Sequence, residues 1–241
     1  MKLKTEWLRR QLLGEVISGL RTSKIALQGF CDVTVGRTIQ DIFCKGKHIF
    51  IDPGDGSVLH NHLLMRGRWK GYDGRLLLLP DGVWLAIEVG ARTVCNVHGQ
   101  MLRAEARDDV QAALDSLGPD VMAEPYPAEQ IMAALAAAQG AIGPALLEQD
   151  RVCGLGNIAK SEALYRAGID PRRSSPTLDE ATLRRLSECI HEVCWRSYRN
   201  GGRWQCDVYQ HRGRPCRRCG HKIVRIVQEG RATYFCPSCQ R

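Results

Sequence analysis

Four cysteines near the end of the chain have the spacing of a metal site. Cys216 and Cys219 form one C-x2-C pair, and Cys236 and Cys239 form a second pair after a sixteen-residue spacer. Two such pairs bring four thiolates to the corners of one tetrahedron, the geometry of a structural zinc ion. The spacer alternates apolar and polar residues around Gly230, which predicts a β-hairpin too small to fold without the metal. A pair of disulfides is the alternative, but the spacing favours one zinc ion.

Positive charge surrounds these cysteines, and the whole chain is basic. Its 241 residues carry a formal net charge of +8, which favours a polyanionic partner. Arg231 follows the predicted turn at Gly230, so its guanidinium could reach a phosphate, although a solubilising turn residue would look the same. The basic residues in or beside the cysteine module are Arg212, Arg214, Arg217, Arg218, Lys222, Arg225, Arg231 and Arg241.

Lys47 and Asn157 are two further candidates for phosphate contacts. Lys47 lies between a glycine turn and the strand-like HIFI, where its ammonium could point at a phosphate. A solvated surface lysine is the plainer alternative. Asn157 ends the glycine turn GLGN at the start of a helix, where exposed backbone N–H groups can bind an anion. Helix capping alone would also explain this asparagine.

Met65 stands between a strand and a turn, with Arg66 and Arg68 beside it. An apolar wedge next to cations suits a protein that fills a gap in a base stack while it holds the backbone. On periodicity alone, an ordinary core methionine is the favoured interpretation. His60 and His62 share one strand face and could bind a metal, but without a third ligand we do not expect a metal there.

Periodicity divides the chain near residue 123 into a β half and a helical half. Residues 4–20 have helical spacing, and residues 23–97 resemble short strands, including KIALQGF, CDVTVG and RLLLLP. Beyond residue 127, helical patterns dominate. We therefore expect an α+β fold. A β-sandwich with a leading helix would span residues 1–122, a helical domain 123–205 and the zinc hairpin 206–241.

The remaining seven cysteines are scattered and odd in number, which favours thiols in a reducing compartment. The start MKLKTEWLRRQLLG is charged and lacks the apolar core of a signal peptide. The longest apolar run, LLLLP, is too short to cross a membrane. We therefore expect a cytoplasmic protein without a membrane partner, associated with the nucleoid if its source is bacterial.

Five stretches carry a resemblance that spans nearly the whole chain: CKGKHIFI, LHNHLLMRGRW, LDSLGPD, ALLEQDRVCGLGNIAKSEALYRAGIDP and VYQHRGRPCRRCGHKIVRIVQEGRATYFCPSCQ. Together they resemble the formamidopyrimidine-DNA glycosylase and endonuclease VIII family of base-excision repair enzymes. The resemblance implies a helix–two-turns–helix domain around GLGN and a zinc finger behind it. The endonuclease VIII branch is favoured, because the family's arginine-phenylalanine-glycine intercalation loop is not visible in CNVHGQ.

The resemblance also implies functional roles. Lys47, Asn157 and Arg231 would bind phosphates around a flipped nucleotide, and Met65 would fill the void that it leaves. Lys47 is also a candidate for the catalytic site. The implied activity is a DNA glycosylase with abasic-site lyase activity, which removes oxidised bases as a monomer on damaged DNA. Its one implied cofactor is structural zinc at Cys216, Cys219, Cys236 and Cys239. A basic zinc module for protein interaction is disfavoured by the length of the match.

One departure from the family concerns the catalytic amine. Family members begin Met-Pro-Glu, and the proline amine attacks C1′ of the damaged nucleotide, whereas this chain begins MKLKTE. An upstream start could restore the motif, or the chain could bind damaged or abasic DNA without turnover. Alternatively, another amine of this chain attacks C1′. The α-amine of Met1 is then the first candidate, because such amines titrate near pH 8, and Lys2 and Lys4 are further ones. Gly143 also replaces a lysine that the family usually has, which predicts a weaker phosphate contact.

Overall fold

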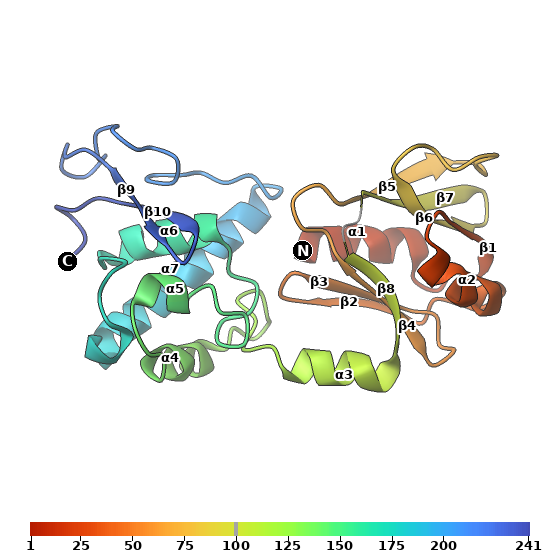
Figure 1. Ribbon diagram of the computed structural model, residues 1–241, viewed down its shortest axis with the longest axis horizontal. Coiled ribbons are helices and arrows are strands. Elements are labelled where there is room, and N and C mark those ends of the chain that lie inside the picture. Colours follow the sequence, from red (N-terminus) through yellow and green to blue (C-terminus); the bar gives the residue numbers. More distant parts are fainter. Residues whose placement is uncertain (99–100) are drawn as a thin grey trace. The chain divides into compact units, whose positions relative to one another are not determined.

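Two units make up the chain in the computed structural model, which describes residues 1–98 and 101–241. The first unit is Met1–Asp115 and the second is Ser116–Arg241. Figure 1 shows strands concentrated in the first unit and helices in the second. Each unit has its own apolar core.

The first unit is built on two antiparallel four-stranded sheets. Strands β6(Val83–Val89) and β7(Arg92–Val97) form the centre of one sheet and are buried along almost their whole length. One sheet has the order β2(Asp41–Lys45), β3(His48–Asp52), β4(Ser57–His62) and β8(Met101–Ala106). The other has the order β1(Ile17–Thr22), β6(Val83–Val89), β7(Arg92–Val97) and β5(Arg68–Asp73).

Helices complete the core of this unit. Helix α1(Lys2–Leu12) buries Leu8 and Leu12 and packs against strands of both sheets. The chain leaves α1 through Gly14, whose φ of 77° is a left-handed conformation that glycine adopts at little cost. The remaining helical elements of the unit are η1(Ile25–Leu27), α2(Gln28–Thr34) and α3(Arg107–Asp115).

Three predictions of secondary structure were wrong. The first helix ends at Leu12 rather than near residue 20, and residues 17–22 form β1. The stretches KIALQGF and CDVTVG form η1 and α2, in which Phe30, Cys31 and Thr34 face inward at helical spacing. RLLLLP contains no strand, and Leu77 and Leu78 are exposed. A short apolar run is compatible with a strand and with a single helical turn, because it is too short to show either periodicity.

The second unit is helical apart from its last hairpin. Helix α7(Glu180–Arg199) follows the N-cap Asp179, whose carboxylate accepts a hydrogen bond from the Thr182 N–H. Helix α6(Asn157–Ala167) ends before its C-cap Gly168, which has a φ of 72°. No helix among the described residues combines the length and the apolar character of a membrane span. The elements are α4(Ala128–Ala136), α5(Ile142–Ala145), α6(Asn157–Ala167), η2(Ser175–Thr177), α7(Glu180–Arg199), β9(Val224–Gln228) and β10(Arg231–Phe235).

Candidate functional site

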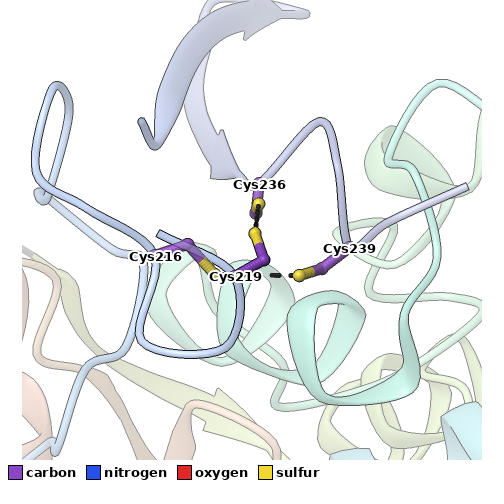
Figure 2. A group of neighbouring side chains, drawn as sticks. All are labelled: Cys216, Cys219, Cys236 and Cys239. Atoms are coloured by element: carbon purple, nitrogen blue, oxygen red, sulfur yellow. Dashed lines mark hydrogen bonds between the residues drawn. The ribbon is translucent and has the colours of Figure 1, made fainter. Parts of the chain in front are cut away.

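The four predicted metal ligands converge in the second unit. Figure 2 shows their side chains pointing toward one another, from the loop before β9 and the segment after β10. All four sulfurs lie within 4.8 Å of one another. The Sγ atoms of Cys216 and Cys239 are 3.8 Å apart, and those of Cys219 and Cys236 are 3.5 Å apart. A zinc–sulfur bond of about 2.3 Å gives a tetrahedral edge of roughly 3.8 Å, whereas a disulfide needs about 2.05 Å. The cluster therefore fits one structural zinc ion and excludes disulfides between these pairs.

Hydrogen bonds prepare this cluster for a metal. The His221 backbone N–H stabilises the Cys219 thiolate and lowers the pKa of that thiol to about 6. Cys216 is buried, which opposes ionisation, but the Tyr165 hydroxyl and the Arg218 N–H hold its pKa below the ordinary value. The Tyr165 hydroxyl lies 3.3 Å from the Cys216 sulfur. These donors favour the thiolate form of Cys216 and Cys219 that zinc requires, whereas burial raises the pKa of Cys236 and the contact with Cys219 raises that of Cys239.

The hairpin β9–β10 places Arg231 on its inner face. Arg231 pairs with Gln228, and Thr233 pairs with Ile226, so the alternation of a strand puts all four side chains on one side. Arg225 pairs with Tyr234 and therefore projects from the opposite side. The Arg231 side chain is exposed, and no described residue forms an ion pair with it. A cation in this position is available for an anion from solution.

Two side chains of helix α6 bind two consecutive residues of this hairpin. The Asn157 Nδ2 donates to the Ala232 carbonyl at 2.7 Å, and the Lys160 Nζ donates to the Thr233 hydroxyl at 2.7 Å. Both contacts lie next to Arg231 in the sequence. Asn157 is the first residue of α6, where the positive end of the helix dipole and the first N–H groups favour an anion. The structure thus brings Asn157 to the residue that follows Arg231, and the roles of both residues as phosphate ligands stay predictions.

Glu162 joins the same helix to the segment that leads into the zinc finger. Its side chain is 0% exposed and accepts three backbone hydrogen bonds, from Asp207 at 2.8 Å, Val208 at 3.0 Å and Tyr209 at 2.8 Å. A buried carboxylate is stable only when such donors satisfy it. Neither Glu162 nor Lys160 was a candidate from the sequence. Their partners lie 45 to 73 residues away, so no local pattern identifies them.

In the first unit, Lys47 lies in the turn between β2 and β3, beside two histidines. Burial lowers the pKa of His48 to about 4, with smaller contributions from His62, His60 and Lys47. Burial also lowers the pKa of His62, and the charge of Lys47 is the second cause. The Leu64 N–H donates to Nδ1 of His62 at 3.0 Å, so the neutral ring carries its proton on Nε2. An ammonium and a neutral imidazole donor at one turn suit an anionic ligand. His48 and His62 lie opposite each other across β3 and β4, a register that the sequence alone did not predict.

Both ring nitrogens of His60 are engaged by protein groups. Its Nδ1 lies 2.8 Å from the Glu105 carboxylate, and its Nε2 lies 2.8 Å from Nδ1 of His48. The carboxylate fixes the proton on Nδ1 of His60, so the second nitrogen accepts from His48. Among the described residues, the only group with metal-site geometry is the cysteine cluster.

Met65 lies in the loop between β4 and β5 and is 93% exposed. The interpretation as a core methionine was therefore wrong. The loop is fixed at both ends, since the Gly67 N–H donates to the Leu63 carbonyl at 2.8 Å and the indole of Trp69 donates to Asn61 at 2.9 Å. A large apolar side chain held in water at the tip of an anchored loop suits insertion into another molecule.

Met1 lies at the N-cap of α1. Its carbonyl accepts from the N–H groups of Lys4 at 2.7 Å and Thr5 at 3.1 Å. Its side chain is half-buried against the core of the first unit. The position of the α-amine is therefore set by a helix and an apolar contact.

Comparisons with known proteins agree with this geometry. Residues 117–205 match the model of the formamidopyrimidine-DNA glycosylase H2TH domain, and residues 213–241 match the zinc finger found in FPG and IleRS. A formamidopyrimidine-DNA glycosylase of Rhodopseudomonas palustris is 31% identical over 245 residues, which cover 86% of this chain and 84% of that protein. One from Streptococcus pyogenes is 31% identical over 267 residues, covering 99% and 94%. The chain belongs to the formamidopyrimidine-DNA glycosylase family.

Solved structures of the family confirm the fold. A complex of Lactococcus lactis Fpg with abasic-site DNA matches with a TM-score of 0.88 and 25% identity, over 100% of this chain and 97% of that one. MutM in complex with DNA containing carbocyclic 8-oxo-G gives the same TM-score and identity, with the same coverage. The predicted α+β class, family and zinc site are confirmed. The assignment to the endonuclease VIII branch stays a prediction, and Gly99 and Gln100 of the stretch CNVHGQ lie outside the described residues.

Gly143 has a steric reason within this family's fold. A Cβ atom added there would lie 2.5 Å from the Gln228 side chain and 2.9 Å from the Pro171 carbonyl. Gln228 itself donates to that carbonyl at 3.0 Å. A side chain at position 143 would therefore require the Gln228 side chain and the backbone at Pro171 to shift.

Proposed function

We propose that the chain is a DNA glycosylase that removes oxidised bases and cuts the strand at the resulting abasic site. The observation that carries the proposal is the contact of Asn157 with the segment of Arg231, on a hairpin whose base holds the four-cysteine cluster, in a chain whose relatives are formamidopyrimidine-DNA glycosylases. The similar structures that contain abasic or 8-oxo-G DNA support damaged DNA as the partner.

Each unit supplies its own part of the grip on DNA in this proposal. Asn157 and Arg231 bind phosphates from the second unit, and Lys47 does so from the first. Met65 fills the stack when the damaged nucleotide leaves it, which offsets the cost of unstacking, about a few kcal/mol. Zinc supplies folding energy to the hairpin that carries Arg231 and takes no part in the reaction.

The chemistry requires a neutral amine, and the proposed one is the α-amine of Met1. The bond from the amine to C1′ forms as the bond from C1′ to the base breaks, and the base leaves with a proton. Opening of the sugar gives a Schiff base. Loss of a C2′ proton then expels the 3′ phosphate. Lys47 is proposed to hold the phosphates during these steps.

Borohydride trapping on abasic-site duplex DNA tests the proposal. Borohydride reduces the Schiff base, so an active amine becomes covalently joined to DNA. We would compare the chain as printed with a version extended by Met-Pro-Glu-Gly-Pro at the front. Trapping by the printed chain would identify a substitute amine, which peptide mass locates, and trapping by the extended chain alone would assign the reaction to the proline. If neither traps while both bind DNA tightly, the chain is a binder of damaged DNA rather than an enzyme.

Arg231→Ala is expected to weaken DNA binding and to reduce its salt dependence by roughly one phosphate contact. The reason is that its exposed guanidinium lies on the inner face of the hairpin, beside Asn157. The measurement is fluorescence anisotropy with abasic-site duplex at several salt concentrations. Arg225→Ala is the matched control, because it removes the same charge from the outer face. Equal salt slopes for wild type and Arg231→Ala would contradict the assignment.

We also propose that the chain acts as a monomer in the cytoplasm. The basic charge and the scattered cysteines support this compartment. The proposed functional division remains a β-sandwich domain over 1–122, a helix–two-turns–helix domain over 123–205 and a zinc finger over 206–241. Its first boundary lies a few residues beyond the division between the two structural units, which falls after Asp115.

A further inference from the structure

Lys160 is a buried cation without an anionic partner. Its side chain is 0% exposed, and its one hydrogen bond within the described chain goes to the Thr233 hydroxyl, at 2.7 Å. No described carboxylate forms an ion pair with it. Buried charges in proteins are ordinarily paired, because removing an ion from water is costly. The other two N–H donors of this ammonium have no hydrogen-bond acceptor among the described residues.

The described residues around Lys160 supply no negative charge that would compensate its ammonium. From β10, the charged group that acts on it is Arg231, which is also a cation. On its own helix, Glu162 is engaged by the amides of residues 207–209. Helix α5 contains no ionisable residue, the buried face of α7 contributes one thiol, Cys194, and Arg225 of β9 lies on the outer face of the hairpin. Burial, with the charge of Arg231 second, lowers the pKa of Lys160 to about 8.

Lys160 is also one half of the attachment that sets the position of Arg231. Asn157 and Lys160 are three residues apart and so lie on one face of α6. They hold the Ala232 carbonyl and the Thr233 hydroxyl, which follow Arg231 directly. Thr233 shares the inner face of the hairpin with Arg231. A displacement of this attachment would move the guanidinium.

We propose that Lys160 is a positioning residue of the phosphate site, which fixes the hairpin beneath Arg231 and whose buried charge is balanced by the DNA phosphate bound there. This inference rests on the proposed function, because it takes Asn157 and Arg231 as phosphate ligands. Lys160 itself touches no DNA. It acts on the phosphate through the position of the hairpin and through the electrostatic field of its ammonium, which the protein interior screens weakly.

The charge of Lys160 makes the affinity for DNA depend on pH. A bound phosphate favours the ammonium, so the pKa of Lys160 is higher in the complex than in the free protein. Its contribution to affinity is fully present below the free pKa of about 8. It is lost as the pH rises from that value through the pKa of the complex, with uptake of one proton on binding.

The test is anisotropy with a duplex containing a tetrahydrofuran abasic analogue, at constant ionic strength, from about pH 6.5 to about pH 9.5. Wild type is expected to bind with constant affinity up to about pH 8 and progressively more weakly above it. Lys160→Met should bind about tenfold more weakly at neutral pH and should lose the decline above pH 8. Lys160→Gln keeps a donor for Thr233 without the charge, so its affinity should be intermediate and equally independent of pH.

Zinc content and thermal denaturation establish whether each variant is folded. If Lys160→Met does not fold, the pH profile of Lys160→Gln provides the test. Wild-type affinity in a folded variant would overturn the inference. So would weaker binding that keeps the wild-type pH profile, since that is the result of a purely structural role. If wild type fails to bind, or Arg231→Ala binds like wild type, the proposed function itself fails and the inference fails with it.

Discussion

Cys236→Ser is expected to release zinc, unfold the β9–β10 hairpin and abolish specific binding to abasic-site DNA. The Cys236 sulfur is buried and lies 3.5 Å from that of Cys219. The finger buries few apolar side chains of its own, among them Ile223 and Phe235, so the metal supplies most of its stability. Structural zinc contributes about 10–16 kcal/mol in isolated fingers at neutral pH. Loss of the hairpin removes Arg231 from Asn157.

The measurements are zinc content per chain, hydrogen exchange over residues 213–241 and anisotropy with abasic-site duplex. Cys189→Ser makes the same substitution at a half-buried position on α7 outside the cluster, and it should keep both zinc and binding. The helical core around α6 and α7 should remain folded in both variants, because its apolar cluster does not include the finger. A Cys236→Ser chain with one zinc and wild-type affinity would contradict the assignment of the ligands.

The sequence was sufficient for features that depend on short-range spacing. Two C-x2-C pairs define a tetrahedral site almost independently of the rest of the fold, because each pair forms one compact turn. The long helix α7 could be predicted because Leu183, Leu186, Ile190 and Val193 repeat at helical spacing and all four are buried. The family resemblance supplied the roles of Lys47, Met65, Asn157 and Arg231, none of which periodicity could have distinguished from surface or core residues.

The sequence was insufficient where distant segments decide the outcome. Met65 fits the pattern of a core residue, and only the anchored loop between β4 and β5 leaves it exposed. Lys160 and Glu162 would be assigned to the surface of a helix by residue type, yet both are buried by the hairpin and by residues 207–209. The weaker phosphate contact predicted at Gly143 stays a prediction, and the packing of the Gln228 side chain against this glycine could not be predicted from the sequence.

Glu162→Ala is expected to destabilise the second unit by about 3–5 kcal/mol and to weaken DNA binding with it. Truncation leaves the N–H groups of Asp207, Val208 and Tyr209 without the carboxylate that accepts them. These residues lead from α7 into the zinc finger, so their release should also loosen the finger. Glu162→Gln keeps one oxygen but places an amide N–H₂ toward one of the donors, and should cost about half as much.

Urea denaturation of the full chain, followed by circular dichroism at the helical signal, measures the loss. Glu188→Ala is the control, because Glu188 lies exposed on α7 and its removal should change the free energy of unfolding by less than about 0.5 kcal/mol. Equal stabilities for Glu162→Ala and Glu188→Ala would show that the three hydrogen bonds add nothing beyond solvation. A graded loss from wild type through Glu162→Gln to Glu162→Ala, with DNA affinity falling in the same order, would show that α6 holds both the hairpin and the segment that connects it. The position of Arg231 then depends on the first half of this helix, since Asn157 and Lys160 hold the hairpin and Glu162 holds the segment that leads into the finger.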